Sequence, residues 1–240
     1  INKSTSFPNE LHQTLAKICV DSYKDISSEN INGFRRKNIF VENVSPFSIL
    51  HAFTYIKDGP KTCIIVFRGT DQHTQWIRNI TGYLIDGPWK NELTQAVEYV
   101  KEIIEKNAGS RIYVCGHSAG GYISQFIART FLLQGASFSA PEFCDCFSFG
   151  NFGKGNNIFY NHVIDGEIVF KVRSILPLNS HNRYGILVVH KPWRFVDLDI
   201  FCTDAIALHN MTDFVKYHFL MTFSCSRAPL WLLSNHRHRY

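Results

Sequence analysis

The sequence predicts an α/β fold with a mainly parallel central sheet that helices cover on both faces. Short apolar runs of strand length, such as 62–67 and 111–115, alternate with segments whose apolar residues recur at helical spacing, such as 91–106. The 240 residues are also 45% hydrophobic, which is enough for one domain of this size to bury a sizeable core.

Each expected element follows from its local pattern of apolar and turn residues. In chain order, strands are expected at residues 47–55, 62–67, 111–115, 147–149, 159–164, 168–172, 186–189 and 194–196, the last two as a hairpin. Helices are expected after Pro8 and over 91–106, 122–133 and 212–220, with Asn107 to Gly109 ending the second and Gly135 closing the third. The later strands are expected to add an antiparallel edge to the sheet.

The chain is expected to form one domain over residues 1–220, followed by a basic tail over 221–240. No internal repeat and no Gly/Ser-rich or Pro-rich linker divides it, and its apolar runs are too short to cross a bilayer. The net charge of +5 favours anionic partners such as acidic lipid surfaces. The basic residues are scattered apart from a cluster over 227–239, which we interpret as solvated tail, so nucleic acid is not the expected partner.

The seven cysteines show neither the number nor the spacing of a disulfide framework or a zinc site. Cys63 and Cys115 lie in expected core strands, where a free thiol acts as a small apolar group. Reduced thiols favour a reducing compartment, either the cytoplasm or, after secretion, another cell's cytosol. Because the chain begins with Ile1 rather than Met, we expect a trimmed start, which leaves a removed signal peptide open.

The motif that carries chemistry is Gly116-His117-Ser118-Ala119-Gly120, between an expected buried strand and an expected helix. A G-x-S-x-G sequence in this context is the nucleophile elbow of α/β-hydrolases. Glycine is needed at both ends because the turn is so tight that a Cβ there would collide with neighbouring backbone. The turn lifts the Ser118 hydroxyl clear of the sheet, and the following helix N-terminus favours a developing oxyanion.

A serine nucleophile needs a general base, and in this fold the chain order is serine, acid, histidine. Among the histidines beyond the elbow, His209 lies just before the last expected helix, where a loop can bring it to the nucleophile. His162 falls inside an expected strand and His218 inside a helix, so packing or surface roles suit them better. His209 is therefore the expected base.

The acid is expected in a loop that follows a strand and precedes the base. Asp165 and Glu167 both occupy the loop after strand 159–164, and either could hold the imidazole in its working tautomer. Composition does not choose between them.

The oxyanion needs a second donor, and strand 62–67 leaves the sheet into Arg68-Gly69-Thr70. Thr70 can offer a backbone N–H and a hydroxyl, while Ala119 N–H supplies the partner donor. Each such donor is worth about 10²–10³ in rate.

Together these motifs resemble the class 3 lipase family over roughly residues 10–220, in matching order. The matching segments are the oxyanion strand Val66 to Thr70, Trp76 to Asn79, the elbow Gly116 to Gly121, Phe147 to Gly150 with Gly155-Asn156, and His209 to Met211 with Phe214. Ala119 stands where the family usually has Leu, and Glu167-Ile168-Val169-Phe170 replaces the usual Asp-(Ile/Pro)-Val-Pro. The resemblance therefore favours Glu167 as the acid, while the missing proline keeps Asp165 as the alternative.

The resemblance implies a hydrolase of lipid esters, a triacylglycerol lipase or a phospholipase A, that needs no metal or organic cofactor. It also implies an interfacial lid after the oxyanion strand. The apolar segment 80–85 is the candidate, and a buried strand or helix start is the other interpretation.

Three alternatives compete with this hypothesis. An acyltransferase or thioesterase would use the same triad with a different acceptor or ester. A non-catalytic binding module would keep the fold alone, and the joint presence of Ser118, His209 and a carboxylate argues against it. A basic nucleic-acid or membrane-surface protein with an accidental motif would bind in a salt-dependent way without esterase activity.

Overall fold

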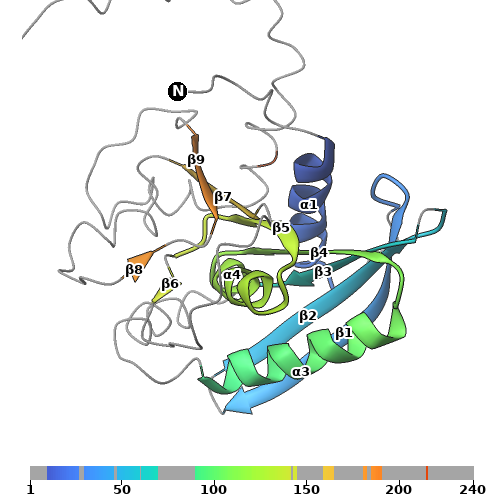
Figure 1. The fold of residues 1–240 in the computed structure, drawn as a ribbon, viewed down its shortest axis with the longest axis horizontal. Coiled ribbons are helices and arrows are strands. Elements are labelled where there is room, and N and C mark those ends of the chain that lie inside the picture. Colours follow the sequence, from blue (N-terminus) through green and yellow to red (C-terminus); the bar gives the residue numbers. More distant parts are fainter. Residues whose placement is uncertain are drawn as a thin grey trace, which may run out of the picture.

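The computed structural model describes residues 10–26, 30–45, 48–59, 61–69, 90–141, 143–144, 159–164, 181–182, 185–190 and 215 (Figure 1). Its helices are α1 (Glu10–Asp21), α3 (Lys90–Lys106) and α4 (Ala119–Phe131). Its strands are β1 (Phe34–Ser45), β2 (Ser48–Lys57), β3 (Thr62–Phe67), β4 (Arg111–His117), β5 (Gln134–Phe138), β6 (Phe143–Cys144), β7 (Phe159–Ile164), β8 (His181–Asn182) and β9 (Ile186–His190).

Seven of these strands form one sheet in the order β1-β2-β3-β4-β5-β7-β9, and β6 pairs separately with β8. From β3 to β9 every pair of neighbours is parallel, whereas β1 and β2 run antiparallel to their neighbours. The predicted, mainly parallel sheet is therefore confirmed.

Helices cover both faces of this sheet because successive side chains of a buried strand point to opposite sides. On β3, Ile64 and Val66 join the core formed with α1, while Ile65 and Phe67 join the core formed with α3 and α4. Figure 1 shows the same division, with α1 on one side of the sheet and α3 and α4 on the other. The predicted layer architecture is thus confirmed in the described residues.

Several expected elements have the predicted bounds or lie within two residues of them. The strands β3 and β7 coincide with the prediction, and α3, β4 and β9 extend it by one or two residues at an end. The strand β2 begins one residue later than predicted and ends two residues later. The expected strands 147–149, 168–172 and 194–196 lie outside the described residues. So does the helix 212–220, apart from Val215, which is helical and buried. No helix in the described part of the chain is long and apolar enough to cross a membrane.

The end of the third expected helix was wrongly predicted. The helix α4 ends at Phe131, and Leu132 adopts the left-handed conformation (φ 54°, ψ 42°) that terminates it. Gly135, expected to close the helix, belongs to β5 instead. A Cβ at Gly135 would lie 1.8 Å from Val114 O on β4, so the close approach of the two strands is what requires glycine there.

An antiparallel pair that the sequence did not predict, β1–β2, forms one edge of the sheet. At the other end of the described sheet β9 runs parallel to β7, while residues 194–196, its expected hairpin partner, lie outside the described residues. The strand β1 was not predicted. Its pairing shifts between Arg36 and Asn38, and such a bulge breaks the alternation that marks a strand in sequence.

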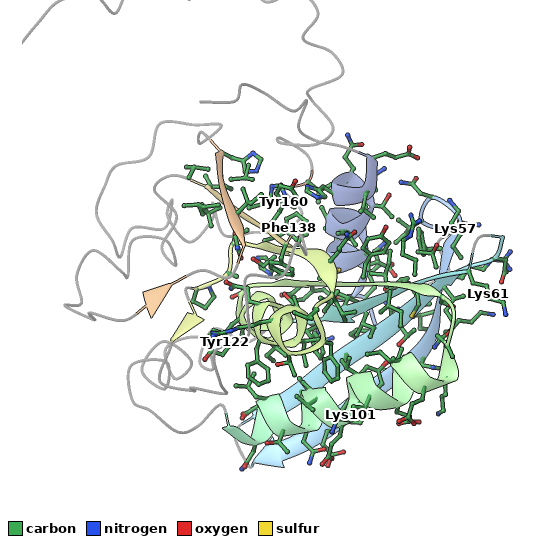
Figure 2. All side chains as sticks on the ribbon, in the orientation of Figure 1. Lys57, Lys61, Lys101, Tyr122, Phe138 and Tyr160 are labelled. Atoms are coloured by element: carbon green, nitrogen blue, oxygen red, sulfur yellow. The ribbon has the colours of Figure 1, made fainter. Side chains whose placement is uncertain are left out.

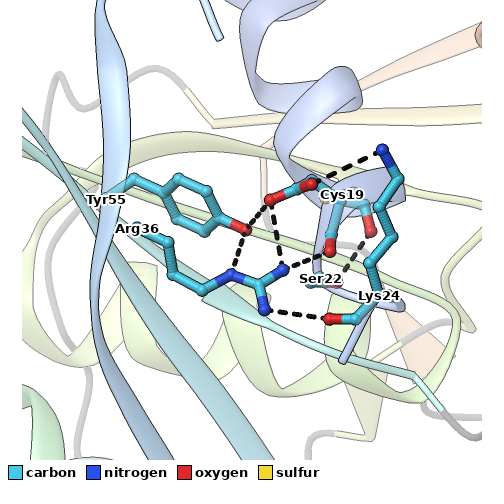
Figure 3. Close-up of polar contacts among 6 residues, drawn as sticks. Cys19, Ser22, Lys24, Arg36 and Tyr55 are labelled. Carbon is cyan, nitrogen blue, oxygen red and sulfur yellow. Dashed lines mark hydrogen bonds and ion pairs between the residues drawn. The ribbon is translucent and has the colours of Figure 1, made fainter. Parts of the chain in front are cut away.

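A buried ion pair holds β1 and β2 against the end of α1 (Figure 3). Arg36 Nη2 lies 3.1 Å from Asp21 Oδ2, and both side chains are at most 5% exposed. Tyr55 donates its hydroxyl to the same carboxylate oxygen at 2.6 Å and accepts from Arg36 Nε at 3.0 Å. Burial and the Asp21 carboxylate raise the pKa of Tyr55. The network fixes the turn after α1, where Tyr23 lies.

The buried thiols have the packing role predicted for them. Cys63 and Cys115 are at most 1% exposed and, like Cys19, carry no disulfide. Burial raises the pKa of Cys63 to about 12, so its thiol stays protonated and unreactive at neutral pH.

The core on the α1 side also contains His12, which is 3% exposed. Burial lowers its pKa from 6.5 to about 4. Between pH 6.5 and pH 4 the unfolded chain therefore binds a proton that the folded chain does not. Stability from this group is complete above pH 6.5 and is lost as the pH falls toward 4.

We expect the free energy of unfolding to drop by about 3 kcal/mol between pH 7 and pH 4 through His12 alone. Urea denaturation at pH 7, 5.5 and 4 measures this drop. The His12→Asn variant, which does not titrate there, should show a pH dependence that is shallower by that amount. Equal slopes in the two proteins would contradict the assignment to His12.

Candidate active site

The elbow has the strand–turn–helix form predicted from the sequence. The strand β4 ends at His117, Ser118 makes the turn, and α4 begins at Ala119. Ser118 has φ 54° and ψ −124°, a conformation that non-glycine residues rarely adopt. Strain of this kind persists only where the surroundings enforce it, and it is typical of a nucleophile elbow.

Steric contacts explain both glycines of the motif. A Cβ at Gly116 would lie 2.2 Å from Gly120 O, and a Cβ at Gly120 would lie 2.0 Å from Phe67 O. Each distance is far below van der Waals contact, and each neighbour is backbone held in the elbow or the sheet. The predicted reason for the two glycines is therefore confirmed.

Backbone hydrogen bonds hold Ser118, the candidate nucleophile, at the carboxyl end of β4. Ser118 N–H donates to Phe138 O at the end of β5, at 3.0 Å, and Ser118 O accepts from Tyr122 N–H at 3.1 Å. Ser118 is the N-cap residue of α4, yet its side chain makes no capping hydrogen bond. The hydroxyl is thus not used in capping, and it stands at the positive end of a 13-residue helix.

The strand expected to carry the oxyanion donor runs beside the elbow. The strands β3 and β4 pair in parallel, with Phe67 opposite Gly116. Two residues later, the Cβ that Gly69 lacks would lie 2.6 Å from His117 O and 3.0 Å from Ser118 Cβ. Thr70 follows directly and lies outside the described residues. The described geometry therefore brings its neighbour Gly69 against the nucleophile.

Tyr23 is a neighbour of the site that the sequence did not indicate. Its hydroxyl shares a 2.8 Å hydrogen bond with His117 Nδ1, across 94 positions of the chain. A Cβ built on Gly69 would lie 2.6 Å from the Tyr23 hydroxyl oxygen. This hydroxyl and Ser118 Cβ are therefore both neighbours of Gly69. The Arg68 guanidinium lies over the Tyr23 ring at 5.8 Å. No local pattern in the sequence signals such a contact.

Removing only this hydroxyl tests what the contact contributes. We expect Tyr23→Phe to lower the free energy of unfolding by about 1 kcal/mol, because one partly buried hydrogen bond to His117 is lost while the ring remains. Urea denaturation at pH 8 measures the change. An unfolding free energy equal to wild type would show that the bond adds nothing to stability.

Several predicted site residues lie outside the described residues. They are Thr70, Asp165, Glu167, His209 and the lid candidate 80–85. The strand β7 is described to Ile164, one position before Asp165, and it lies two places from β4 in the sheet. Of the six predicted site residues, the structure therefore brings together Ser118 and Ala119.

The sheet order and the strand–turn–helix elbow are those of the α/β-hydrolase fold. The family model described as Lipase (class 3) matches residues 64–175. The match includes residues 64–67 of β3, the elbow and both candidate acids, and it ends before His209. It bears out the resemblance to the class 3 lipases inferred from the sequence, over this part of the chain, and it supports a lipase-type serine ester hydrolase.

Solved structures of fungal lipases share the fold. The lipase from Rhizopus microsporus var. chinensis has a TM-score of 0.57 and 15% identity, with 75% of this chain and 73% of that chain covered. The Rhizomucor miehei lipase propeptide complex has a TM-score of 0.57 and 18% identity, with 86% and 78% covered. A triacylglycerol lipase from Penicillium expansum has a TM-score of 0.57 and 18% identity, with 77% and 79% covered. A comparison with curated protein sequences finds no match.

Proposed function

We propose that the chain hydrolyses lipid esters through an acyl-enzyme intermediate, with Ser118 as the nucleophile. The observation that carries this proposal is the strained Ser118 at the N-terminus of α4, with a hydroxyl that makes no capping bond. A structural serine at a helix start would be expected to cap the helix. A nucleophile must instead keep its hydroxyl available for attack.

The proposed reaction has two halves. Ser118 Oγ attacks the ester carbonyl while His209 takes the hydroxyl proton, and the N–H groups of Thr70 and Ala119 stabilise the tetrahedral oxyanion. Collapse of this intermediate expels the alcohol, which receives the proton from His209. Water, deprotonated by the same imidazole, then releases the fatty acid and restores Ser118.

The acid that orients His209 is proposed to be Glu167, with Asp165 as the alternative. Both follow β7, whose described end at Ile164 belongs to the core packed against α1. A buried strand end two places from β4 in the sheet supports either carboxylate. Activity of Glu167→Gln and Asp165→Asn separates them, because the variant of the true acid loses far more.

A lipid ester is the proposed substrate because the structures similar in fold include a triacylglycerol lipase. The net charge of +5 adds an anionic lipid surface as the proposed site of action. Neither point depends on a cofactor.

The test measures fatty-acid release from three substrates: a triacylglycerol emulsion, phospholipid vesicles with and without anionic lipid, and a short soluble ester. A serine-reactive phosphonate is applied in parallel, and the labelled peptide is identified by mass spectrometry. Fatty-acid release together with label on Ser118 supports the proposal, and the preferred lipid defines the substrate. Transfer of the acyl group to an added alcohol in preference to water would indicate an acyltransferase. Silence on every ester and no label on Ser118 would overturn the proposal.

A further inference from the structure

Three histidines from three separate elements form a hydrogen-bonded chain on the α1 side of the sheet. His162 Nε2 lies 3.1 Å from His12 Nδ1, and His162 Nδ1 lies 3.0 Å from His190 Nε2. They come from α1, β7 and β9, which Figure 1 shows in the same part of the molecule. His12 and His162 are 3% and 0% exposed, and His190 is half-buried. We refer to His12, His162 and His190 as the imidazole chain.

Hydrogen bonding explains the short distances between these nitrogens. Within the described residues, no group of three histidine, cysteine or acidic side chains has a geometry that could hold a metal ion. Both ring nitrogens of His162 already bond to other imidazoles. The imidazole chain therefore consists of three rings that donate and accept protons, each hydrogen-bonded to the next.

Counting protons shows when both bonds can exist. Each hydrogen bond holds one proton, and a neutral imidazole carries one. The neutral chain has three protons: one in each bond and one on an outer nitrogen, His12 Nε2 or His190 Nδ1. A fourth proton fills the other outer nitrogen, and both bonds survive. A fifth proton, the second one added to the neutral imidazole chain, places an N–H group on both sides of one hydrogen bond. That hydrogen bond then breaks.

The imidazole chain contacts the residue that anchors the nucleophile. The His162 ring stacks on the Phe138 ring, with centroids 5.2 Å apart and planes at 15°. Phe138 O is the acceptor of Ser118 N–H, and Ser139 N–H donates to His162 O at 2.7 Å. Along the sequence, the candidate acids Asp165 and Glu167 follow His162 by three and five residues.

We propose that the imidazole chain positions the carboxyl end of β7 relative to Ser118, and that it does so until it takes up a second proton. This inference rests on the proposed function, since it assigns the imidazole chain a role in ester hydrolysis. The three histidines are positioning residues, because they act through β5 and β7 and not on the ester.

The surroundings of His12 favour its neutral form. Burial lowers the pKa of His12 to about 4, well below the ordinary value of 6.5. The titratable ring beside it is Tyr160 on β7, in edge contact with His12 at 4.6 Å. On α1 the nearest acidic residue along the chain is Glu10, which is exposed, and β5 contributes the apolar ring of Phe138. Tyr160 and Phe138 are labelled in Figure 2, next to each other between α1 and β9.

His190, the half-buried member of the imidazole chain, offers a matched pair of variants. His190→Gln places an amide near the position of Nε2, so the bond to His162 can persist without a titrating ring. His190→Leu removes the bond. A half-buried histidine on β2, His51, is replaced by glutamine as the control. The readouts are kcat and KM on a short soluble ester from pH 4 to pH 9, with melting temperature as the check on folding.

At pH 8 we expect His190→Gln to keep kcat within about twofold of wild type. His190→Leu should lose roughly 10- to 100-fold in kcat with little change in KM, because the carboxyl end of β7, which precedes both candidate acids, is displaced. As the pH approaches 4, the pKa of His12, log kcat of wild type should fall with a slope above 1, since the base and the imidazole chain both take up protons there. His190→Gln should reduce this slope toward 1, and His51→Gln should leave both readouts unchanged.

Equal kcat for His190→Leu and wild type at pH 8 would overturn the inference, and so would an unchanged acid slope in His190→Gln. A His190→Leu protein that melts early but keeps wild-type kcat per folded molecule would also overturn it, because its role would then be structural only. If His190→Leu fails to fold, the pair His12→Asn and His12→Leu repeats the comparison at the other end.

The inference and the proposed function fail in different ways. A wild-type protein that neither hydrolyses esters nor reacts with the phosphonate removes the proposed function, and the positioning role falls with it. Full wild-type activity with no difference between the His190 variants removes the positioning role alone.

Discussion

Ser118→Ala is expected to lower ester hydrolysis by about 10⁴-fold or more, while the protein stays folded. A serine nucleophile and its base act as a unit, so losing the attacking oxygen removes nearly all covalent catalysis. The substitution adds no atom and no new backbone strain, because Ser118 already carries a Cβ at φ 54°. It also removes no helix cap, because the Ser118 hydroxyl makes no capping bond. The measurement is kcat/KM on the preferred ester, with circular dichroism and melting temperature as checks on the fold.

A buried serine on the next turn of the same helix provides the matched control. Ser124 is 0% exposed, and its hydroxyl donates to Gly121 O at 2.8 Å. Ser124→Ala removes a hydroxyl from α4 without touching the nucleophile, so it should keep wild-type activity per folded molecule. If Ser118→Ala retained more than about a hundredth of wild-type activity, another residue would be the nucleophile.

The elbow could be predicted from sequence because its determinants are local. The strand β3 was predicted with its observed bounds, since Thr62–Phe67 is a continuous apolar run that follows a turn. Ser118 was identified because the glycines on either side are required by backbone contacts inside the motif and with β3. In both cases, the residues that make the structure are those that a short window displays.

Features that depend on distant partners were missed or could not be decided. Arg36 interrupts the apolar pattern of β1, yet it is buried because Asp21, 15 positions away, neutralises it. Tyr23 reaches His117 from 94 positions away, and His12 reaches His162 from 150. The choice between Asp165 and Glu167 is of the same kind, since it depends on where the loop meets His209 and not on the local sequence.

Gly135 shows a local signal that was assigned the wrong cause. Glycine after an amphipathic helix is typical of a helix stop, and the sequence contains no competing sign at Leu132. The glycine is instead required by β4, because Val114 O occupies the space of its Cβ. A glycine in sequence thus indicates a close approach or an unusual backbone angle, but it does not indicate which element makes that demand.

Gly120→Ala is expected to reduce activity by about 100-fold and to lower the free energy of unfolding by at least about 3 kcal/mol. Alanine inside a helix normally stabilises by about 1 kcal/mol relative to glycine, so propensity alone predicts the opposite sign. The difference comes from the contact with β3, because the new Cβ would lie 2.0 Å from Phe67 O. Neither side can yield without moving α4 away from the sheet, and Ser118 moves with it.

Gly109→Ala separates this clash from the general effect of replacing glycine. Gly109 has φ +81°, and a Cβ there would meet nothing within 4 Å, so the variant has backbone strain without a collision. It should cost about 1 kcal/mol and leave activity per folded molecule unchanged, because the turn after α3 lies at the opposite end of β4 from the elbow. Urea denaturation and kcat measured on both variants make the comparison. If Gly120→Ala were as stable and active as Gly109→Ala, the contact with Phe67 would not be what fixes glycine in the elbow. The position of Ser118 would then depend on its own backbone strain and on the bond from its N–H to Phe138 O.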